Sequence, residues 1–267
     1  FIGNTQDVTE LRIAQIQVEE KVIELNRSNQ DLEQFAYVAS HDLQEPLRKI
    51  QRFSEKLKSK LSRQLDTEVA DYLNRMSNAA ERMRALIDDL LAFSKATRDS
   101  RSFAKVRLGE VIYQAIHQLD FMIELKKAHI QVRCDMEIDG IGSQLIQLFQ
   151  NLIGNSLKFT RNDISPEIFV DVKIKYGHEL KMTEVHQNQV YCIIEVRDNG
   201  IGFEEAEAVQ IFDVFYRLHS RADYEGTGIG LAICKKIADN HSGLIYARAT
   251  KNMGSVFTVV LPRKQIK

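Results

Sequence analysis

Hydrophobic residues recur every seven positions in two separate stretches of the chain. In residues 11–39 the repeat consists of Leu11, Val18, Leu25 and Leu32. In residues 67–96 it consists of Val69, Met76, Met83 and Leu90, with Leu73, Ala80 and Ile87 between them. Such a repeat places its members on one face of an α-helix, and another helix must cover that face. The pattern therefore predicts two long helices that each pack against a helical partner.

The first helix is predicted to form a parallel coiled coil between two chains. The interleaved positions that complete the seam are Val22, Asn29 and Ala36. A buried Asn29 would fix the register of the two chains. An ordinary amphipathic helix packed within one chain is the alternative.

The helix over 67–96 is predicted to belong to an antiparallel hairpin. The short polar turn KSKLSRQLDTE joins it to the helical segment before it. One hairpin is too thin to bury its hydrophobic stripe, so two hairpins are expected to pair as a four-helix bundle.

Composition excludes several classes of function. The 267 residues include 36 Lys and Arg against 37 Asp and Glu, so no broad basic surface for nucleic acid or membrane is expected. No apolar run reaches the roughly 18 residues that a membrane span needs. Three widely spaced cysteines without zinc-site spacing indicate a reducing, cytoplasmic environment, although a segment upstream of this chain could be membrane-anchored.

After a boundary near 100–105 the pattern changes to a mixture of strands and helices. Predicted strands lie near 130–134, 168–176, 190–197 and 255–261, and predicted helices near 108–127, 143–159, 203–216 and 229–241. The second and third strands should be antiparallel, because the polar loop between them is too short for a crossover helix. This loop, 177–189, has no predicted role.

His41 lies on a polar helix face within the segment FAYVASHDLQEPLRKI. The apolar stripe of this segment consists of Leu43, Leu47 and Ile50. His41 lies about 200° around the helix from Leu43, so its ring should point away from the core. Pro46 removes a backbone hydrogen bond and is expected to bend the helix just after the histidine.

Three polar side chains share one face of the predicted helix 143–159. Asn151, Asn155 and Lys158 follow one another by four and three residues. Amide oxygens can bind Mg²⁺ without neutralising its charge, and a lysine adds a positive charge for the same phosphate. A solvated helix face is the alternative for this trio taken alone.

Asp198 ends a hydrophobic strand and is followed by Gly200 and Gly202. A carboxylate at this place can accept a hydrogen bond from the amino group of adenine, and it would repel the carbonyl oxygen of guanine. An ordinary turn is the alternative interpretation.

A second glycine cluster, Gly226, Gly228 and Gly230, opens the predicted helix 229–241. Backbone N–H groups at a helix N-terminus can bind a polyphosphate. The spacing fits neither a dinucleotide-binding fingerprint nor a P-loop. The segment 203–225 is predicted to be a mobile lid, in which Arg217 can reach a terminal phosphate.

Taken in order, these segments resemble the sequence boxes of a bacterial sensor histidine kinase of two-component signalling, of the phytochrome-like subgroup. SHDLQEPLR resembles the phosphoacceptor box, NLIGNSLKFT the asparagine box and DNGIGF the first glycine box. IFDVFYRLH resembles the phenylalanine box and GTGIGLAI the second glycine box. The resemblance covers residues 31 to about 262, and the opening GNTQDVTELR resembles the end of a PAS sensor domain.

The resemblance implies an all-α dimeric four-helix bundle, followed by an α/β sandwich that binds ATP, like the domains of gyrase B and MutL. The expected divisions are a truncated sensor end with a coiled coil at 1–30, a dimerisation and phosphotransfer domain at 31–100, and a catalytic ATP-binding domain at 101–267. The implied activity is ATP-dependent phosphorylation of a histidine and transfer to an aspartate of a response regulator. The implied partners are a second copy of the chain and a receiver domain.

Carried over by position, His41 would be the phosphoacceptor and Asp42 would polarise its ring. Asn155 would hold Mg²⁺, and Asn151 would lie near the phosphates of ATP. Lys158 and Arg217 would supply positive charge during transfer. The other residues implied to bind nucleotide are Asp198, on adenine, and Phe159, Gly200, Ile201, Gly202, Gly226, Thr227, Gly228, Ile229, Gly230 and Leu231.

Two other functions are compatible with parts of the pattern. A dimeric scaffold would bind ATP without transferring phosphate, but no expected group is missing from the site. An ATP-hydrolysing clamp of the gyrase or MutL type would need an acid near Asn155, and residues 149–154 contain none. Glu45 stands where kinases that dephosphorylate their partner often carry Thr or Asn, so weak phosphatase activity is expected.

Overall fold

A computed structural model of the chain describes residues 12–13, 16–18, 20–21, 24, 43–59, 67–98, 103–161, 163–180, 182–218, 224 and 226–265. The chain divides into two compact units, Phe1–Ile87 and Asp88–Lys267, and each is described by itself. Only scattered helical residues of the predicted coiled coil are among the described ones, so that prediction stays untested.

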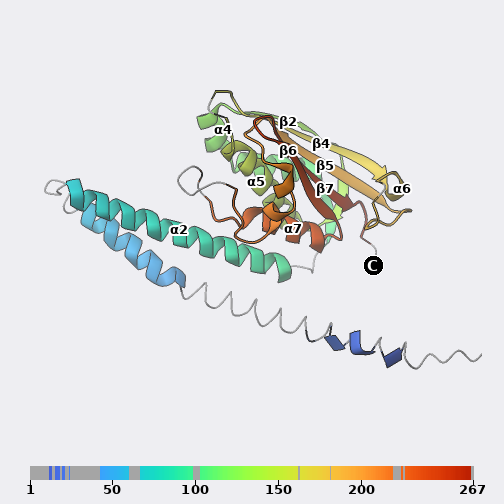
Figure 1. Ribbon diagram of the computed structural model, residues 1–267, viewed down its shortest axis with the longest axis horizontal. Coiled ribbons are helices and arrows are strands. Elements are labelled where there is room, and N and C mark those ends of the chain that lie inside the picture. Colours follow the sequence, from blue (N-terminus) through green and yellow to red (C-terminus); the bar gives the residue numbers. More distant parts are fainter. Residues whose placement is uncertain are drawn as a thin grey trace, which may run out of the picture. The chain divides into compact units, whose positions relative to one another are not determined.

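The first unit contains a hairpin of two antiparallel helices (Figure 1). One helix covers residues 43–59, and the second, α2, spans Thr67–Arg98 and continues into the second unit. The predicted hairpin is therefore confirmed. Its buried hydrophobic side chains are Leu47, Leu73, Ala80 and Ile87.

The heptad stripe of α2 is only half buried. Leu73, Ala80 and Ile87 are at most 8% exposed, whereas Val69, Met76 and Met83 are 44%, 52% and 45% exposed. The second set lies one helical turn from the first, along the same side of the helix. The hairpin thus leaves an exposed row of hydrophobic side chains at the coiled-coil spacing.

The second unit is built around a five-stranded sheet with the strand order β2-β4-β5-β7-β6. The strands are β2 (His129–Arg133), β4 (Glu167–Tyr176), β5 (Val190–Asp198), β7 (Gly254–Pro262) and β6 (Leu244–Thr250). β2 pairs with β4 in parallel, and the remaining pairs are antiparallel. The predicted antiparallel pairing of β4 and β5 is therefore confirmed, in the register Ile168 opposite Asp198.

Helices cover one face of this sheet (Figure 1). They are α3 (Leu108–His117), α5 (Gly142–Lys158) and α7 (Gly230–Asn240), with the short α4 (Asp120–Lys126) beside α5. Alternate residues of β5, namely Cys192, Ile194 and Val196, are fully buried, as expected where one face of a strand meets the core. A separate two-stranded sheet pairs β1 (Ala104–Arg107) with β3 (Glu137–Gly140).

The prediction of a helix over 203–216 is wrong. Two short 3₁₀ turns stand there, η1 (Glu205–Glu207) and η2 (Gln210–Phe212). The backbone does not continue a helical ladder, because Phe215 has a φ of 67° and donates its N–H to the carbonyl of Gly228. The predicted helix 108–127 is also interrupted, since α3 ends at His117 and α4 begins at Asp120.

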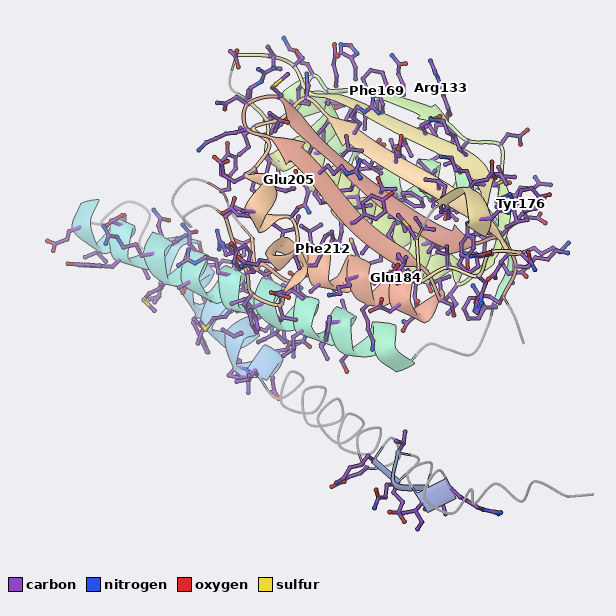
Figure 2. The ribbon with its side chains drawn as sticks, turned by 45° about the vertical axis from the view of Figure 1, so that its right-hand side comes forward. Arg133, Phe169, Tyr176, Glu184, Glu205 and Phe212 are labelled. Carbon is purple, nitrogen blue, oxygen red and sulfur yellow. The ribbon has the colours of Figure 1, made fainter. Side chains whose placement is uncertain are left out.

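The described part of the loop 177–189, which leaves out residue 181, begins with α6 (Gly177–Leu180). Its residue Val185 packs with Tyr191, Ile193 and Val260, which lie on the sheet face opposite the helices. The partly buried side chains around this cluster are Leu180, Met182, Leu244 and Tyr246. Tyr176, at the end of β4, and Glu184, within the loop, are labelled in Figure 2. The loop therefore covers one end of the sheet's outer face.

Candidate functional site

A pocket that opens to solvent lies between α5, the end of β5, η2 and α7. The structure places six of the residues predicted from the sequence in its wall: Asn155, Phe159, Asp198, Ile201, Gly202 and Leu231. The other lining residues are Phe203, Ile211, Leu218, Ser255 and Phe257. A mostly apolar wall with a few polar groups is typical of a site for a small organic ligand.

Asp198 is the principal polar group of the pocket and is 9% exposed. Its Oδ1 atom accepts hydrogen bonds from the N–H groups of Gly200 at 2.8 Å and Ser255 at 3.2 Å. Its Oδ2 atom accepts from the hydroxyl of Ser255 at 2.5 Å and lies 3.4 Å from that of Ser156. These contacts fix the orientation of the carboxyl group toward a ligand.

Burial raises the pKa of Asp198, and the hydrogen bonds from Ser255 and Gly200 act against this shift. The hydroxyl oxygen of Ser156 also lies 3.1 Å from the carbonyl oxygen of Leu152, and the hydroxyl can donate its one proton to that carbonyl. Oδ2 therefore keeps lone-pair capacity for an additional donor, such as an amino group of a purine.

Gly200 allows the backbone after Asp198 to approach the end of α5. A Cβ atom at Gly200 would lie 2.3 Å from the carbonyl oxygen of Phe159. That oxygen accepts a hydrogen bond from the N–H of Ile201 at 3.0 Å. The close approach places Phe159 and Ile201 in the same pocket wall.

Asn151 contacts the second glycine cluster at the start of α7, outside the residues that line the pocket. The Nδ2 atom of Asn151 donates to the carbonyl of Gly230 at 3.1 Å. Ile229 is fully buried and its N–H donates to the hydroxyl of Thr227 at 3.3 Å. The first turn of α7 is thereby tied to α5.

Lys158 lies beside Gly226. A Cβ atom at Gly226, whose φ is 141°, would lie 2.6 Å from the Nζ atom of Lys158. The same Nζ atom lies 4.3 Å from the centre of the Phe159 ring. Glycine at position 226 therefore leaves room for the lysine next to the pocket wall.

Arg217 contacts backbone carbonyls. Its Nη1 atom donates to the oxygen of Gly226 at 2.6 Å, and its Nη2 atom donates to the oxygen of Tyr224 at 2.7 Å. Gly228, with a φ of 80°, lies against the Arg217 side chain and the backbone of Tyr216. Of the predicted lid, the structure describes 203–218 and 224.

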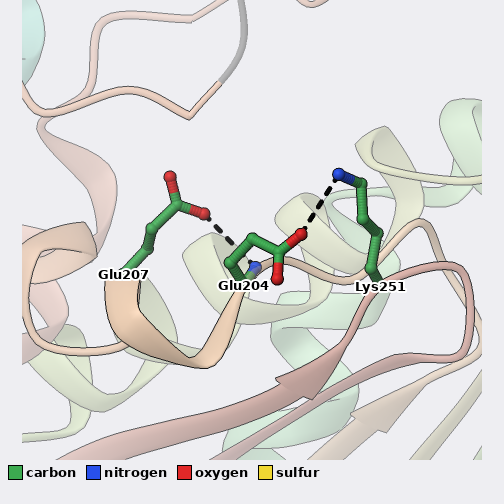
Figure 3. A network of polar contacts seen from close by, with 3 residues as sticks. All are labelled: Glu204, Glu207 and Lys251. Carbon is green, nitrogen blue, oxygen red and sulfur yellow. Dashed lines mark hydrogen bonds and ion pairs between the residues drawn. The ribbon is translucent and has the colours of Figure 1, made fainter.

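The segment that follows Gly202 is fixed by a small charged network (Figure 3). Lys251 donates to the Oε1 atom of Glu204 at 3.1 Å, and the N–H of Glu204 donates to the Oε2 atom of Glu207 at 3.3 Å. This network ties η1 to the turn between β6 and β7.

Among the described residues, no group of three His, Cys, Asp or Glu side chains is arranged to hold a metal ion. The carboxamide of Asn155 lines the pocket on the same helix as Lys158. A neutral amide oxygen suits a Mg²⁺ ion that keeps most of its water and phosphate ligands. The residues present therefore fit a magnesium ion that arrives with a phosphate ligand.

His41 and Asp42 lie outside the described residues, so their predicted roles are not tested by the structure. Sequence reasoning missed Ser156 and Ser255, which contact Asp198. Ser156 lies on α5, one residue after Asn155, and this position in the sequence could have indicated a residue of the site. Ser255 lies 57 residues from Asp198, and nothing in the local sequence indicates that contact.

Residues 140–265 match the family described as histidine kinase-, DNA gyrase B-, and HSP90-like ATPase. Residues 31–99 match the His Kinase A (phospho-acceptor) domain. Phytochrome-like protein Cph1 of Synechocystis sp. is 37% identical over 89% of this chain and 30% of its own length. Sensor histidine kinase WalK of Bacillus subtilis is 28% identical over 91% of this chain and 39% of its own length.

Among solved structures, full-length ShkA in complex with AMPPNP aligns over 88% of this chain and 47% of its own, with a TM-score of 0.61 and 18% identity. At that identity the likeness concerns the fold alone. The chain spans about 30% of the length of the phytochrome relatives that it matches.

Proposed function

The chain belongs to the family of sensor histidine kinases with a HisKA and a HATPase_c domain, and from this we propose that it transfers the γ-phosphoryl group of Mg-ATP to His41. The phosphoryl group would then pass to an aspartate of a response regulator. The observation that carries the proposal is the buried Asp198 in the wall of an apolar pocket, with lone-pair capacity for the amino group of adenine.

The proposed transfer needs few protein groups. A neutral imidazole nitrogen of His41 attacks the γ-phosphorus; the new N–P bond forms as the bond to the β–γ bridging oxygen breaks, and ADP leaves with that electron pair. Asp42 would accept a hydrogen bond from the other ring nitrogen and stabilise the positive ring. In the second step, an aspartate oxygen of the receiver domain displaces His41 from phosphorus.

The predicted nucleotide-binding residues would act mainly by position and charge. Asn155 would hold Mg²⁺, which neutralises phosphate charge when it is bound. Lys158 would lie near the phosphates, since it neighbours both Gly226 and Phe159. Asn151 would keep the first turn of α7 against α5. The backbone N–H groups of that turn would bind the triphosphate. The remaining predicted residues that line the pocket would enclose the base.

We propose that two copies of the chain pair through the exposed hydrophobic row of α2. Val69, Met76 and Met83 follow one another at seven-residue spacing and are about half exposed in one chain. A second hairpin would cover them and complete a four-helix bundle. We also propose the domain division 1–30, 31–100 and 101–267 given by the sequence.

We further propose that the chain works in the cytoplasm, because its three cysteines are free thiols, as expected in a reducing environment. Within the described ranges, no helix has both the length and the apolar composition that a membrane span requires.

We propose weak phosphatase activity, because the carboxylate of Glu45 would repel an aspartyl phosphate. Glu45 forms an exposed ion pair with Lys49 at 2.7 Å.

Incubation with γ-labelled ATP and Mg²⁺ tests the proposed activity. The purified chain should acquire an acid-labile, base-stable label that His41→Gln does not acquire. A label that persists in His41→Gln, or none in the original chain, would reject the proposal.

A further inference from the structure

The guanidinium group of Arg217 holds a short stretch of backbone in a defined position. It donates to the carbonyl oxygens of Tyr224 at 2.7 Å and Gly226 at 2.6 Å. A guanidinium fork that binds two acceptors at once restricts both of them. The location of Tyr224 is therefore set in part by Arg217.

The ring of Tyr224 packs against the ring of Phe159. Its centre lies 5.0 Å from the centre of the Phe159 ring, and the two planes are tilted by 48°. Phe159 itself lines the pocket. Tyr224 thus stands directly beside a side chain that a bound nucleotide would contact.

The neighbours of Tyr224 show which part of a nucleotide it faces. Lys158 lies on the Phe159 ring and next to Gly226, two residues after Tyr224. The proposed base-binding group, Asp198, lines the same pocket as Phe159. Tyr224 therefore stands beside a wall residue of the proposed base pocket and close in the chain to Gly226, which neighbours the proposed phosphate-side lysine.

We propose that Tyr224 is a nucleotide-contacting residue, and that its ring and that of Phe159 pack against the ribose and the adjoining face of adenine. Arg217 is then a positioning residue for Tyr224, in addition to any contact with phosphate. An aromatic ring suits this place because it offers a large apolar face with few rotatable bonds. This inference rests on the proposed function, since it requires that the pocket bind ATP.

Calorimetric titration of the full chain with ADP and Mg²⁺ tests the contact. Tyr224→Ala should weaken ADP binding about 3- to 10-fold, the range expected for loss of one aromatic contact. Tyr224→Phe should recover most of that loss, because the ring and not the hydroxyl makes the contact. The matched control is Tyr113→Ala, since Tyr113 is a 59% exposed tyrosine on α3 and should not affect binding.

A tryptophan reporter gives a second measurement that does not depend on affinity. The chain contains no tryptophan, so Tyr224→Trp carries a single one. Its emission should change on addition of ADP and saturate at the calorimetric dissociation constant. An affinity in Tyr224→Ala equal to that of the original chain, or an unresponsive reporter, would overturn the inference.

A double-mutant cycle tests whether Arg217 acts on ADP binding through Tyr224. If Arg217 positions Tyr224, then Tyr224→Ala should weaken binding less in an Arg217→Ala background than in the original chain. Equal losses in both backgrounds would remove the positioning role.

Failure of the inference and failure of the proposed function give different results. If the original chain does not bind ADP, the proposed function fails. If it binds ADP, loses binding in Asp198→Asn, and keeps its affinity in Tyr224→Ala, only the role of Tyr224 fails.

Discussion

The Nε2 atom of His241 accepts a hydrogen bond at 3.0 Å from the backbone N–H of Ile141, 100 residues earlier in the chain. The Nδ1 atom of the same ring donates to the carbonyl of Ile237 at 2.8 Å. Both nitrogens are therefore used in one neutral tautomer. His241 is fully buried and joins the end of α7 to the start of α5, with the Phe103 ring packed edge-on against it.

This geometry predicts that stability falls as the solution becomes mildly acidic. Burial lowers the pKa of His241 below its ordinary value of 6.5. Below about pH 6.5, His241 is protonated in the unfolded chain but stays neutral in the folded chain. The free energy of unfolding therefore falls as the pH drops from about 6.5 toward the lowered pKa of the folded state. The slope should approach about 1.4 kcal/mol per pH unit for this one group.

Urea denaturation at several pH values between about 7.5 and 5.5 measures the slope. His241→Gln supplies a donor and an acceptor but no titrating group, so its slope should be smaller over the same interval. Asp198, whose raised pKa acts in the opposite direction, is present in both proteins. Equal slopes in the two proteins would show that His241 is not responsible.

A second prediction concerns the space between Gly226 and Lys158. Gly226→Ala places a Cβ atom 2.6 Å from the Nζ atom of Lys158, at a φ of 141° that alanine rarely adopts. We expect about a tenfold weaker binding of ADP, measured by calorimetry, because the lysine must move. Gly142→Ala is the control, since a Cβ atom at Gly142 meets nothing within 4 Å. Similar losses in both variants would contradict the steric explanation.

A third prediction concerns the loop 177–189. Val185 is 7% exposed and packs with Tyr191, Ile193 and Val260. Val185→Ala should lower the free energy of unfolding by about 1–2 kcal/mol, measured by urea denaturation, and should leave ADP affinity unchanged. Val209→Ala is the control, because Val209 is 77% exposed and should change stability by less than about 0.5 kcal/mol. Loss of ADP binding in Val185→Ala would show that the loop also supports the pocket.

The fourth prediction concerns pairing of two chains. Met76→Glu places a charge in the exposed heptad row of α2 and should convert a dimer to a monomer in light-scattering measurements. Phe121→Glu is the control, because Phe121 is 75% exposed but lies on α4, outside this row. Dissociation in Phe121→Glu but not in Met76→Glu would place the interface elsewhere.

Periodic patterns in the sequence predicted the elements that carry a long hydrophobic face. The predicted helix 143–159 is α5, and the predicted strand 190–197 is β5, each within one residue at either end. Such elements are readable because burial of one face repeats the same residue type at a fixed spacing. The last turn of α5 and the end of β5 also place Asn155 and Asp198 in one pocket, as the sequence predicted.

Contacts between distant segments could not be predicted in this way. The helix expected over 203–216 does not form, because backbone groups in this segment make hydrogen bonds with distant residues. The N–H of Phe215, for example, donates to the carbonyl of Gly228. The strand β6 was missed because LIYARAT follows α7 closely and shows no clean alternation. Ser255 reaches Asp198 because β5 and β7 pair in antiparallel fashion, with Arg197 opposite Val256, so the end of β5 lies beside the start of β7.

Localisation of the phosphoryl group tests the central claim most directly. The full chain would be incubated with Mg-ATP, digested at neutral to mildly alkaline pH and analysed by mass spectrometry. We predict one added phosphoryl group on the peptide that contains His41, and its absence from Asp198→Asn treated in the same way. A phosphoryl group on any other residue, or an unmodified His41 peptide from a chain that binds ATP, would contradict the account.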